Sequence, residues 1–325
     1  MIEVCAIPPL ATVQYLGRHG HWFQGLGRAG VMDSLAHRAA NILLGNDDSA
    51  ATLEIPLTPA RFRFTKRQAF AIAGAVCGAT LADRALPRVW AGHAEAGDCL
   101  DLGGMTSGAR VYLALPGGID VPKVLGSRST QLREAFGGFH GRVLATGDQL
   151  RALSDSTHFL PKGGFGLELP QIRPADDAAI TLRALVASEY DDFSAEAQQA
   201  FWATPFVVTP QSNRQGYRLD GVALNREGRG ELRSHGIVPG IVQVPGSGAP
   251  IIQLADSATM GGYPKIAAVI SADLWRLGQA RPGDSLRFEP VDLPTAAEAD
   301  REINRTVESW RSEVAKISQK QRSWT

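Results

Sequence analysis

Glycine is spread through this chain in a way that restricts it to folds with many turns. The chain has 35 glycines among its 325 residues, about 11% where the average is near 7%. They lie between short alternating or β-branched runs and form no low-complexity tract. This spacing predicts short strands joined by many turns, and hence a mainly β fold with few helices.

Local patterns place the elements approximately. We expect strands over residues 51–55, 70–74, 110–117, 206–210, 240–245 and 265–270. We expect helices over 34–44 capped by Asp33, over 195–202 capped by Ser194, from Ser271 onward, and over the charged, nearly glycine-free tail 295–320.

The segment Gly-Asp-x-Leu occurs three times, within residues 96–103, 146–150 and 282–288. Each copy follows a turn-like glycine or proline and opens a short expected strand. One interpretation is convergent turn chemistry, since Gly-Asp suits many hairpins. The other is a duplicated barrel edge, with at least one copy in each of two related domains.

The overall composition excludes several classes of protein. The chain carries 33 basic and 33 acidic residues, so no net charge draws it to nucleic acid or to a membrane surface. Its longest apolar run, 69–82, is shorter than the roughly 20 residues of a membrane-spanning helix, and the N-terminus lacks signal-peptide features. Three scattered cysteines fit a reducing compartment and form no metal-binding spacing. We therefore expect a cytoplasmic protein without a metal site of its own.

Residues 254–270 form the most informative stretch for function. Two apolar runs flank a turn at Gly261-Gly262, where a ligand could approach the main chain because no Cβ stands in the way. The polar side chains gathered on this turn are Asp256, Thr259, Tyr263 and Lys265. The alternative is a tight turn in which Asp256 and Thr259 only bond the local backbone.

Two further clusters suit an anionic small molecule. Arg214 and Arg218 flank a glycine turn, and an arginine can bind a carboxylate through two hydrogen bonds. Structural alternatives are that Arg218 pairs with Asp220 or with Asp256. A second cluster of donors follows the Gly117-Gly118 turn and comprises Ser127, Arg128, Ser129 and Thr130, of which Ser129 could instead cap a short helix.

Five segments carry a family resemblance: residues 29–46, 116–130, 213–219, 233–252 and 254–270. The fourth segment contains His235 and Gln243. In this order along the chain, the five segments resemble the family of the 5-oxoprolinase C subunit, whose members are also described as allophanate hydrolase subunit 2, KipA-like or biotin-dependent carboxyltransferase-like proteins. The resemblance runs from about residue 3 to about residue 290. It implies two cyclophilin-like β-barrel domains, which we place at 1–160 and 161–291, followed by a helical tail over 292–325. Strands exchanged between the two halves would shift these boundaries.

The resemblance implies ATP-dependent hydrolysis of 5-oxoproline to glutamate, in a complex with an A subunit plus a KipI-like B subunit. ATP with Mg would act in the assembled complex, and the chain would be inactive alone. We expect Asp256, Thr259 and Lys265 to be catalytic. We expect substrate to contact Arg214, Arg218, Gly261, Gly262, Tyr263, Gln243, Ser127, Arg128 and Ser129.

Two other functions remain open. Fused relatives transfer a carboxyl group to urea or a related amide; this chain has no Met-Lys dipeptide, so biotin would have to arrive on another chain. The chain could also be a regulator that binds a KipI-like B subunit. Tyr15, Ala258 and Met260 replace an acid, an amide and a hydroxyl that the family commonly has, which leaves the substrate open.

Overall fold

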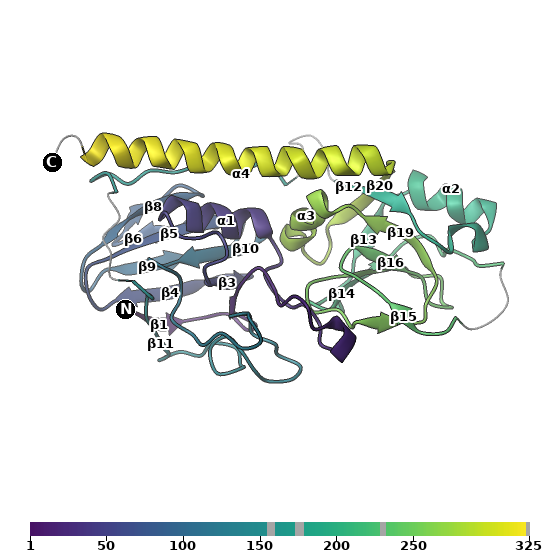
Figure 1. Cartoon of the computed structure of the whole chain (residues 1–325), viewed down its shortest axis with the longest axis horizontal. Helices are drawn as coiled ribbons and strands as arrows, with labels where there is room; N and C mark the ends of the chain where they lie inside the picture. Colours follow the sequence, from purple (N-terminus) through teal and green to yellow (C-terminus); the bar gives the residue numbers. More distant parts are fainter. Residues whose placement is uncertain (155–159, 173–178, 228–231, 323–325) are drawn as a thin grey trace. The chain divides into compact units, whose positions relative to one another are not determined.

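The computed structural model describes residues 1–154, 160–172, 179–227 and 232–322 (Figure 1). Its contacts divide the chain into two units. The first comprises Met1–Arg18, Asp33–Pro170 and Asn304–Thr325, and the second comprises His19–Met32 and Gln171–Ile303. The domain boundaries expected near residues 160 and 291 stay predictions.

The first unit contains two antiparallel sheets. The six-stranded sheet has the order β11-β1-β4-β9-β6-β7, and the five-stranded sheet has the order β2-β3-β10-β5-β8. The strands are β1 (Ile2–Ala6), β2 (Thr12–Gln14), β3 (Thr52–Pro56), β4 (Ala60–Phe64), β5 (Gln68–Val76), β6 (Thr80–Leu81), β7 (Arg84–Ala85), β8 (Trp90–Ala94), β9 (Cys99–Leu102), β10 (Ser107–Ala114) and β11 (Gln149–Leu150).

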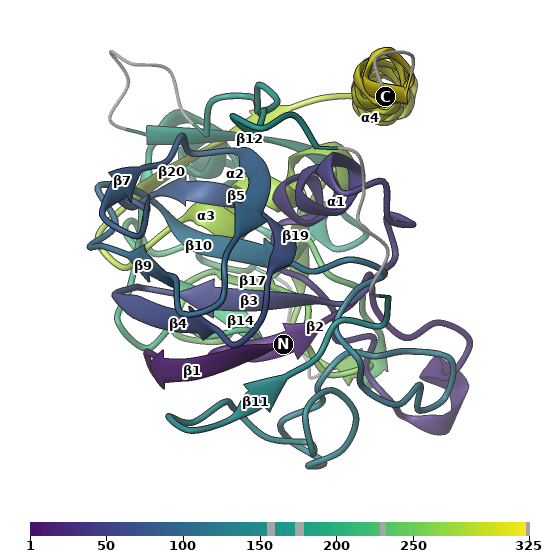
Figure 2. The ribbon, with the colours of Figure 1, turned by 90° about the vertical axis from the view of Figure 1, so that its left-hand side faces the viewer.

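An apolar core lies in the first unit. Phe62 and Phe64 of one sheet and Phe70 and Leu113 of the other are fully buried in it. Helix α1 (Ser34–Leu43) packs on β5 and β10, as Figure 2 shows. In the described part of this unit the strands pair as two sheets, and residues of both sheets pack in this common core.

The second unit contains a closed barrel with the strand order β12-β19-β16-β17-β14-β13-β20, and a two-stranded sheet β15-β18. The strands are β12 (Ala179–Val186), β13 (Phe206–Val208), β14 (Gly216–Asp220), β15 (His235–Gly236), β16 (Ile241–Gln243), β17 (Ile251–Gln253), β18 (Met260–Gly261), β19 (Lys265–Val269) and β20 (Ser285–Pro290). The helical segments are η1 (Trp22–Gln24), η2 (Tyr190–Asp192), α2 (Ala195–Ala203), η3 (Ser271–Asp273) and α3 (Leu274–Gln279).

Aromatic rings pack at the core of the second unit. Phe201 of α2 stacks on Phe288 of β20 with ring centroids 4.5 Å apart, and Phe206 packs beside both. All three side chains are fully buried. The barrel closes where β12 runs parallel to β20, with Ala179 opposite Ser285. The expected mainly β fold, its barrel and its C-terminal helix are confirmed.

The three Gly-Asp segments form the same turn in both units. In each, the glycine adopts a φ between +92° and +95°, which favours glycine strongly. The aspartate side chain then accepts the backbone N–H three residues earlier: Asp98 from Glu95, Asp148 from Ala145 and Asp284 from Arg281, at 2.8–2.9 Å. Each turn leads directly into a strand, as the sequence predicts.

The helix predictions succeed where a side chain caps the helix. Asp33 accepts from the N–H groups of Leu35 and Ala36 at 2.9 Å, and Ser194 caps α2. The helical segment expected from Ser271 onward is also present: Ser271 begins η3, and α3 follows from Leu274. The tail forms α4 (Leu293–Arg322), whose first part belongs to the second unit and whose last part belongs to the first.

Candidate functional site

Lys265 begins β19 with a buried side chain, and two other side chains hold its ammonium group. Nζ lies 3.0 Å from Oε2 of Glu189 and also contacts Nε2 of His235. The backbone N–H of Lys265 donates to the same Glu189 oxygen over 3.0 Å. Because Lys265 is only 8% exposed, water screens this ion pair weakly.

Glu189 lies immediately before η2 and is ionised in the folded protein. Burial acts to raise the pKa of Glu189, but hydrogen bonds from Ser188 and Lys265 outweigh burial and lower that pKa overall. The Ser188 hydroxyl donates to Oε1 over 2.6 Å, which leaves Oε2 for Lys265. Glu189 therefore carries a fixed negative charge beside the lysine at neutral pH.

Two glutamines on neighbouring barrel strands lie near this pair, and the first of them, Gln243, is opposite Lys265 in the strand register. Nε2 of Gln243, on β16, donates to the carbonyl oxygen of Tyr263 over 3.1 Å, and its Oε1 accepts from Nε2 of Gln253 over 3.0 Å. A Cβ added to Gly261 would lie 2.8 Å from Gln243 Nε2, so a larger residue there would push the glutamine amide aside. Gln243 of β16 thus supports the glycine turn through the Tyr263 carbonyl oxygen.

The small β15-β18 sheet brings the turn to His235. His235 pairs with Gly261 across this sheet, and the carbonyl oxygen of Thr259 accepts from the N–H of Ile237 over 3.1 Å. Gly262 packs against the main chain, since an added Cβ would lie 3.0 Å from the Leu232 carbonyl oxygen. The sequence therefore predicted part of a real cluster, comprising Lys265, Gln243, Gly261, Gly262 and Tyr263 together with the half-buried Thr259.

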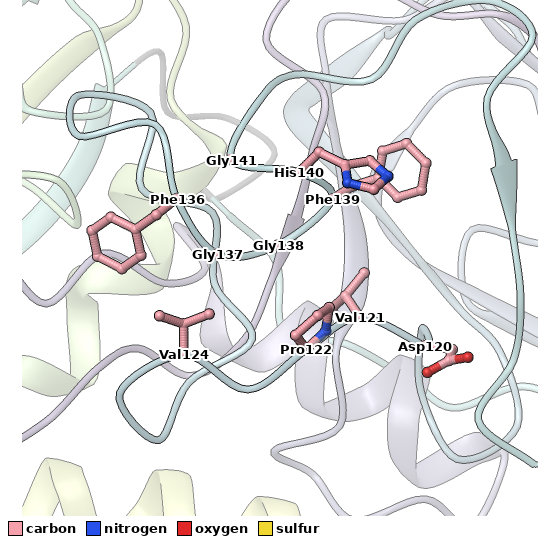
Figure 3. A pocket seen from close by; sticks show the side chains of 10 residues that line it. All are labelled: Asp120, Val121, Pro122, Val124, Phe136, Gly137, Gly138, Phe139, His140 and Gly141. Carbon is pink, nitrogen blue, oxygen red and sulfur yellow. The ribbon is translucent and has the colours of Figure 1, made fainter.

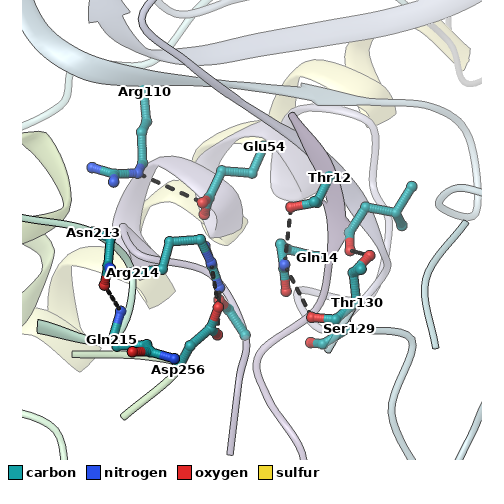
Figure 4. A network of polar contacts seen from close by, with 12 residues as sticks. Thr12, Gln14, Glu54, Arg110, Ser129, Thr130, Asn213, Arg214, Gln215 and Asp256 are labelled. Carbon is teal, nitrogen blue, oxygen red and sulfur yellow. Dashed lines mark hydrogen bonds and ion pairs between the residues drawn. The ribbon is translucent and has the colours of Figure 1, made fainter. Parts of the chain in front are cut away.

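Arg214 and Asp256 pair with each other. Nε of Arg214 lies 2.8 Å from Oδ2 of Asp256, and Nη2 lies 2.9 Å from Oδ1 (Figure 4). Nη2 also donates to the carbonyl oxygen of Gly30. Of the structural alternatives, an arginine does pair with Asp256, but it is Arg214 and not Arg218. The carboxylate of the chain itself occupies the fork that we expected to bind substrate.

Other predicted residues on this unit lie at its surface. Arg218 occupies an exposed position on β14, whose opposite face buries Tyr217 and Leu219. Tyr263 is 51% and Met260 is 56% exposed, so the turn presents an aromatic ring and a thioether to solvent. The substrate contacts expected for Arg218 and Tyr263 stay predictions.

The predicted donor cluster of the first unit is used inside the fold. The Ser129 hydroxyl accepts from the N–H of Tyr15 over 3.2 Å and donates to its carbonyl oxygen over 3.3 Å, and the Ser127 hydroxyl accepts from the N–H of Ser129 over 3.0 Å. Nε of Arg128 donates to the carbonyl oxygen of Val121 over 2.9 Å. Both serine side chains are fully buried. These contacts fix the loop after β2, and a substrate contact at Ser127, Arg128 or Ser129 stays a prediction.

A cavity of about 220 Å³ lies beside this loop in the first unit (Figure 3). Its walls are mostly apolar, with Val121, Val124, Phe136 and Phe139 among them. Gly137 is one of the lining residues, and its backbone lies against the buried serine loop, since an added Cβ would lie 2.3 Å from the Ser129 carbonyl oxygen. The serine loop therefore packs directly against the wall of the cavity.

The first unit also contains a buried polar network around Tyr112. The Tyr112 hydroxyl donates to Oε2 of Glu54 over 2.7 Å and accepts the N–H of Asp33 over 2.8 Å. Arg110 lies 3.6 Å from the other Glu54 oxygen (Figure 4). Burial, and then the charges of Glu54 and Asp33, raise the pKa of Tyr112, so its hydroxyl keeps its proton. The network joins β3, β10 and the start of α1.

Sequence reasoning missed Glu189 and recognised His235 only as part of a motif. A buried lysine needs a carboxylate, but the pattern does not show which of 33 acidic residues provides it. Among the described residues, no cluster of three or more His, Cys, Asp or Glu side chains could hold a metal ion. In the same part of the chain, no helix is long and apolar enough to cross a membrane.

Comparison with known proteins gives one consistent result. Residues 24–290 match the family described as "Carboxyltransferase domain, subdomain A and B". The chain is 40% identical to the C subunit of 5-oxoprolinase from Escherichia coli, over 96% of this chain and 98% of the relative. It is 39% identical to the protein of the same name from Haemophilus influenzae, over 93% of this chain and 94% of the relative.

A solved structure agrees. The urea carboxylase of Kluyveromyces lactis superposes with a TM-score of 0.87 and 30% identity, over 95% of this chain but only 29% of that longer chain. The resemblance inferred from the five sequence segments is thereby confirmed. The chain belongs to the family of the 5-oxoprolinase C subunit, which is built on the carboxyltransferase domain, subdomains A and B.

Proposed function

We propose that this chain is the C subunit of an ATP-dependent 5-oxoprolinase, which opens the lactam of 5-oxoproline to give glutamate together with the A and B subunits. The observation that carries the proposal is the 40% identity to a 5-oxoprolinase C subunit over 98% of that protein. Such end-to-end similarity favours the same role in the complex over a shared domain in a different protein.

The cluster around Lys265 suits this chemistry. An unstrained lactam resists water, and phosphorylation of its oxygen by ATP would make its carbon a better electrophile. Oriented cationic and backbone donors stabilise the charge on the phosphoryl oxygens during that transfer. Lys265 and the N–H groups of Gly261 and Gly262 are our candidates for these donors. Of the two other expected catalytic residues, Asp256 and Thr259, Asp256 would act while bound to Arg214, as a support for the turn or as a group that orients water.

We further propose that the chain is inactive alone, that ATP and Mg bind in the assembled complex, and that the complex acts in the cytoplasm. The three cysteines are all free thiols, which fits a reducing compartment. The half-exposed Tyr263 and Met260 would be covered by bound substrate or by the B subunit.

The test is glutamate formation from 5-oxoproline and ATP by this chain, co-purified with the B subunit, then supplemented with the A subunit. We expect glutamate and ADP in the full mixture and none when this chain is left out. A stable complex that forms no glutamate would refute the proposal.

Carboxyl transfer to urea or a related amide is the second candidate, because the urea carboxylase structure superposes over 95% of this chain. It requires biotin on another chain. Incubation of the same complex with a biotinylated carrier, bicarbonate, ATP and urea distinguishes the two functions. Carboxylated product without glutamate would favour this candidate, and neither product would favour a regulator of the B subunit.

A further inference from the structure

Two of the three cationic side chains predicted for the site in the second unit are already neutralised by a carboxylate of the chain. Lys265 pairs with Glu189 at 3.0 Å, and Arg214 pairs with Asp256 through two contacts of 2.8 and 2.9 Å. A pair of opposite charges at such short range exerts little net attraction on an anion. These pairs are therefore poor receptors for a carboxylate, whereas Lys265 can still donate a hydrogen bond to a neutral oxygen.

The ammonium group of Lys265 has one donor left. Of its three N–H groups, one faces Glu189 Oε2 and one faces His235 Nε2. Within the part of the chain that the structure describes, no other side chain or carbonyl oxygen bonds to Nζ. The lysine is held in place by two partners, and its third N–H is available to a ligand.

We propose that Glu189 and His235 are positioning residues that fix Lys265 so that its remaining N–H donates to the amide oxygen of the substrate. This inference rests on the proposed function and assigns a part of the substrate to this cluster. Under the proposed function the lactam oxygen receives the phosphoryl group, so a donor fixed in advance holds this oxygen in line for the transfer and stabilises the negative charge that the phosphoryl group brings to it. The substrate carboxylate must then be bound by other groups.

His235 can accept a hydrogen bond from the Lys265 ammonium group in only one tautomer. Its Nδ1 lies 2.9 Å from the Arg233 carbonyl oxygen, which can only accept a hydrogen, so Nδ1 carries the proton. Nε2 is then an acceptor and faces the Lys265 ammonium group. The register of the β15-β18 sheet, with His235 opposite Gly261, keeps the imidazole in this position.

Nitrogen NMR of the histidine side chains in the full chain tests this geometry without any enzyme assay. We expect His235 to be protonated at Nδ1, with an unprotonated Nε2 whose shift changes in Lys265→Met but not in Glu289→Gln, an exposed barrel position. A His235 protonated at Nε2, or a spectrum insensitive to Lys265→Met, would overturn the proposal.

Two fragments of the substrate test which part binds here. 2-Pyrrolidinone keeps the lactam and lacks the carboxylate, whereas cyclopentanecarboxylate keeps the carboxylate and lacks the lactam. We expect 2-pyrrolidinone to shift the His235 ring signals of the assembled complex and this shift to vanish in Lys265→Met. If only cyclopentanecarboxylate does so, the cluster binds the carboxylate and the proposal is wrong.

Kinetics of the assembled complex complete the test. Lys265→Met should lower kcat about 100-fold, as loss of one oriented donor does. Glu189→Gln keeps the shape of the side chain and removes its charge; we expect kcat to fall at least about 10-fold while KM stays within about twofold. His235→Gln, which retains an acceptor, should recover most of the activity lost in His235→Ala.

These measurements distinguish failure of the proposed function from failure of the positioning role alone. A wild-type complex without turnover refutes the proposed function, while the NMR measurements still decide how Lys265 is held. An active wild-type complex in which Glu189→Gln behaves like Glu289→Gln refutes the positioning role alone.

Discussion

His37 is a histidine that folding forces to stay neutral. It is fully buried in α1, where Nδ1 lies 2.8 Å from the Thr52 hydroxyl and Nε2 lies 3.5 Å from the amide nitrogen of Asn41. Burial lowers its pKa from 6.5 to about 4. The unfolded chain therefore takes up a proton at His37 between those two pH values, and the folded chain does not.

The first prediction follows from that difference. The free energy of unfolding should not depend on protonation of His37 above pH 6.5. As the pH falls from 6.5 to about 4, protonation of His37 in the unfolded chain should lower that free energy by about 3 kcal/mol in total. Urea denaturation of wild type and His37→Gln at several pH values measures it. We expect the gap between the two proteins to change in favour of His37→Gln as the pH falls, and curves that stay parallel would contradict the prediction.

Only some of the site residues could be predicted from the sequence, because others meet their partners only through strand pairing in the fold. Gly261, Gly262, Tyr263 and Lys265 are neighbours in the chain, so one pattern shows them together. Glu189 lies 76 residues before Lys265, and only the pairing of β12 with β19 brings its segment to the lysine. Arg214 and Asp256 were both identified, but their partnership depends on the pairing of β14 with β17, which the pattern does not encode.

Strand β5 depends on one glycine. Gly74 has a φ of +132°, and a Cβ there would lie 2.3 Å from the Arg110 carbonyl oxygen. It sits beside the irregular stretch where the register of β10 on β5 shifts. Gly74→Ala combines backbone strain with a clash against main chain that cannot move away.

We predict that Gly74→Ala lowers the free energy of unfolding by more than the roughly 1–3 kcal/mol of backbone strain alone. Two controls in the same unit separate the causes. Gly97→Ala has a φ of +95° and open space, so it should show the strain only, and Gly104→Ala has neither and should be neutral. Equal midpoints for Gly74→Ala and Gly97→Ala in denaturant would contradict the role of the clash.

Elements that are set by interactions between neighbouring residues could be predicted from the sequence. Strand pairings between residues far apart in the chain could not. Asp33 and Ser194 cap their helices through bonds to residues two or three positions away, and the Gly-Asp turns are equally local. The parallel pairing of β12 with β20 joins residues more than 100 positions apart.

Each of the two units has apolar contacts of its own, so we expect a destabilising substitution in one unit to leave the other unit folded. The first unit has its own apolar cluster, and the second has the barrel around Phe201 and Phe288. The last part of α4 belongs to the first unit and buries Val307, Trp310 and Val314. It is also tied there by Arg311, whose Nη2 lies 2.9 Å from Oδ2 of Asp48.

Trp310→Ala should therefore destabilise the first unit selectively, by about 3–5 kcal/mol as for other buried tryptophans. Hydrogen exchange measured by mass spectrometry reports each unit separately. We expect amides of β5 and β10 to exchange faster and those of β12 and β19 to keep their rates, while Glu313→Ala, an exposed position on the same helix, changes neither. Equal acceleration in both units would mean that the chain unfolds as one cooperative body, and that α4 stabilises the whole molecule through either end.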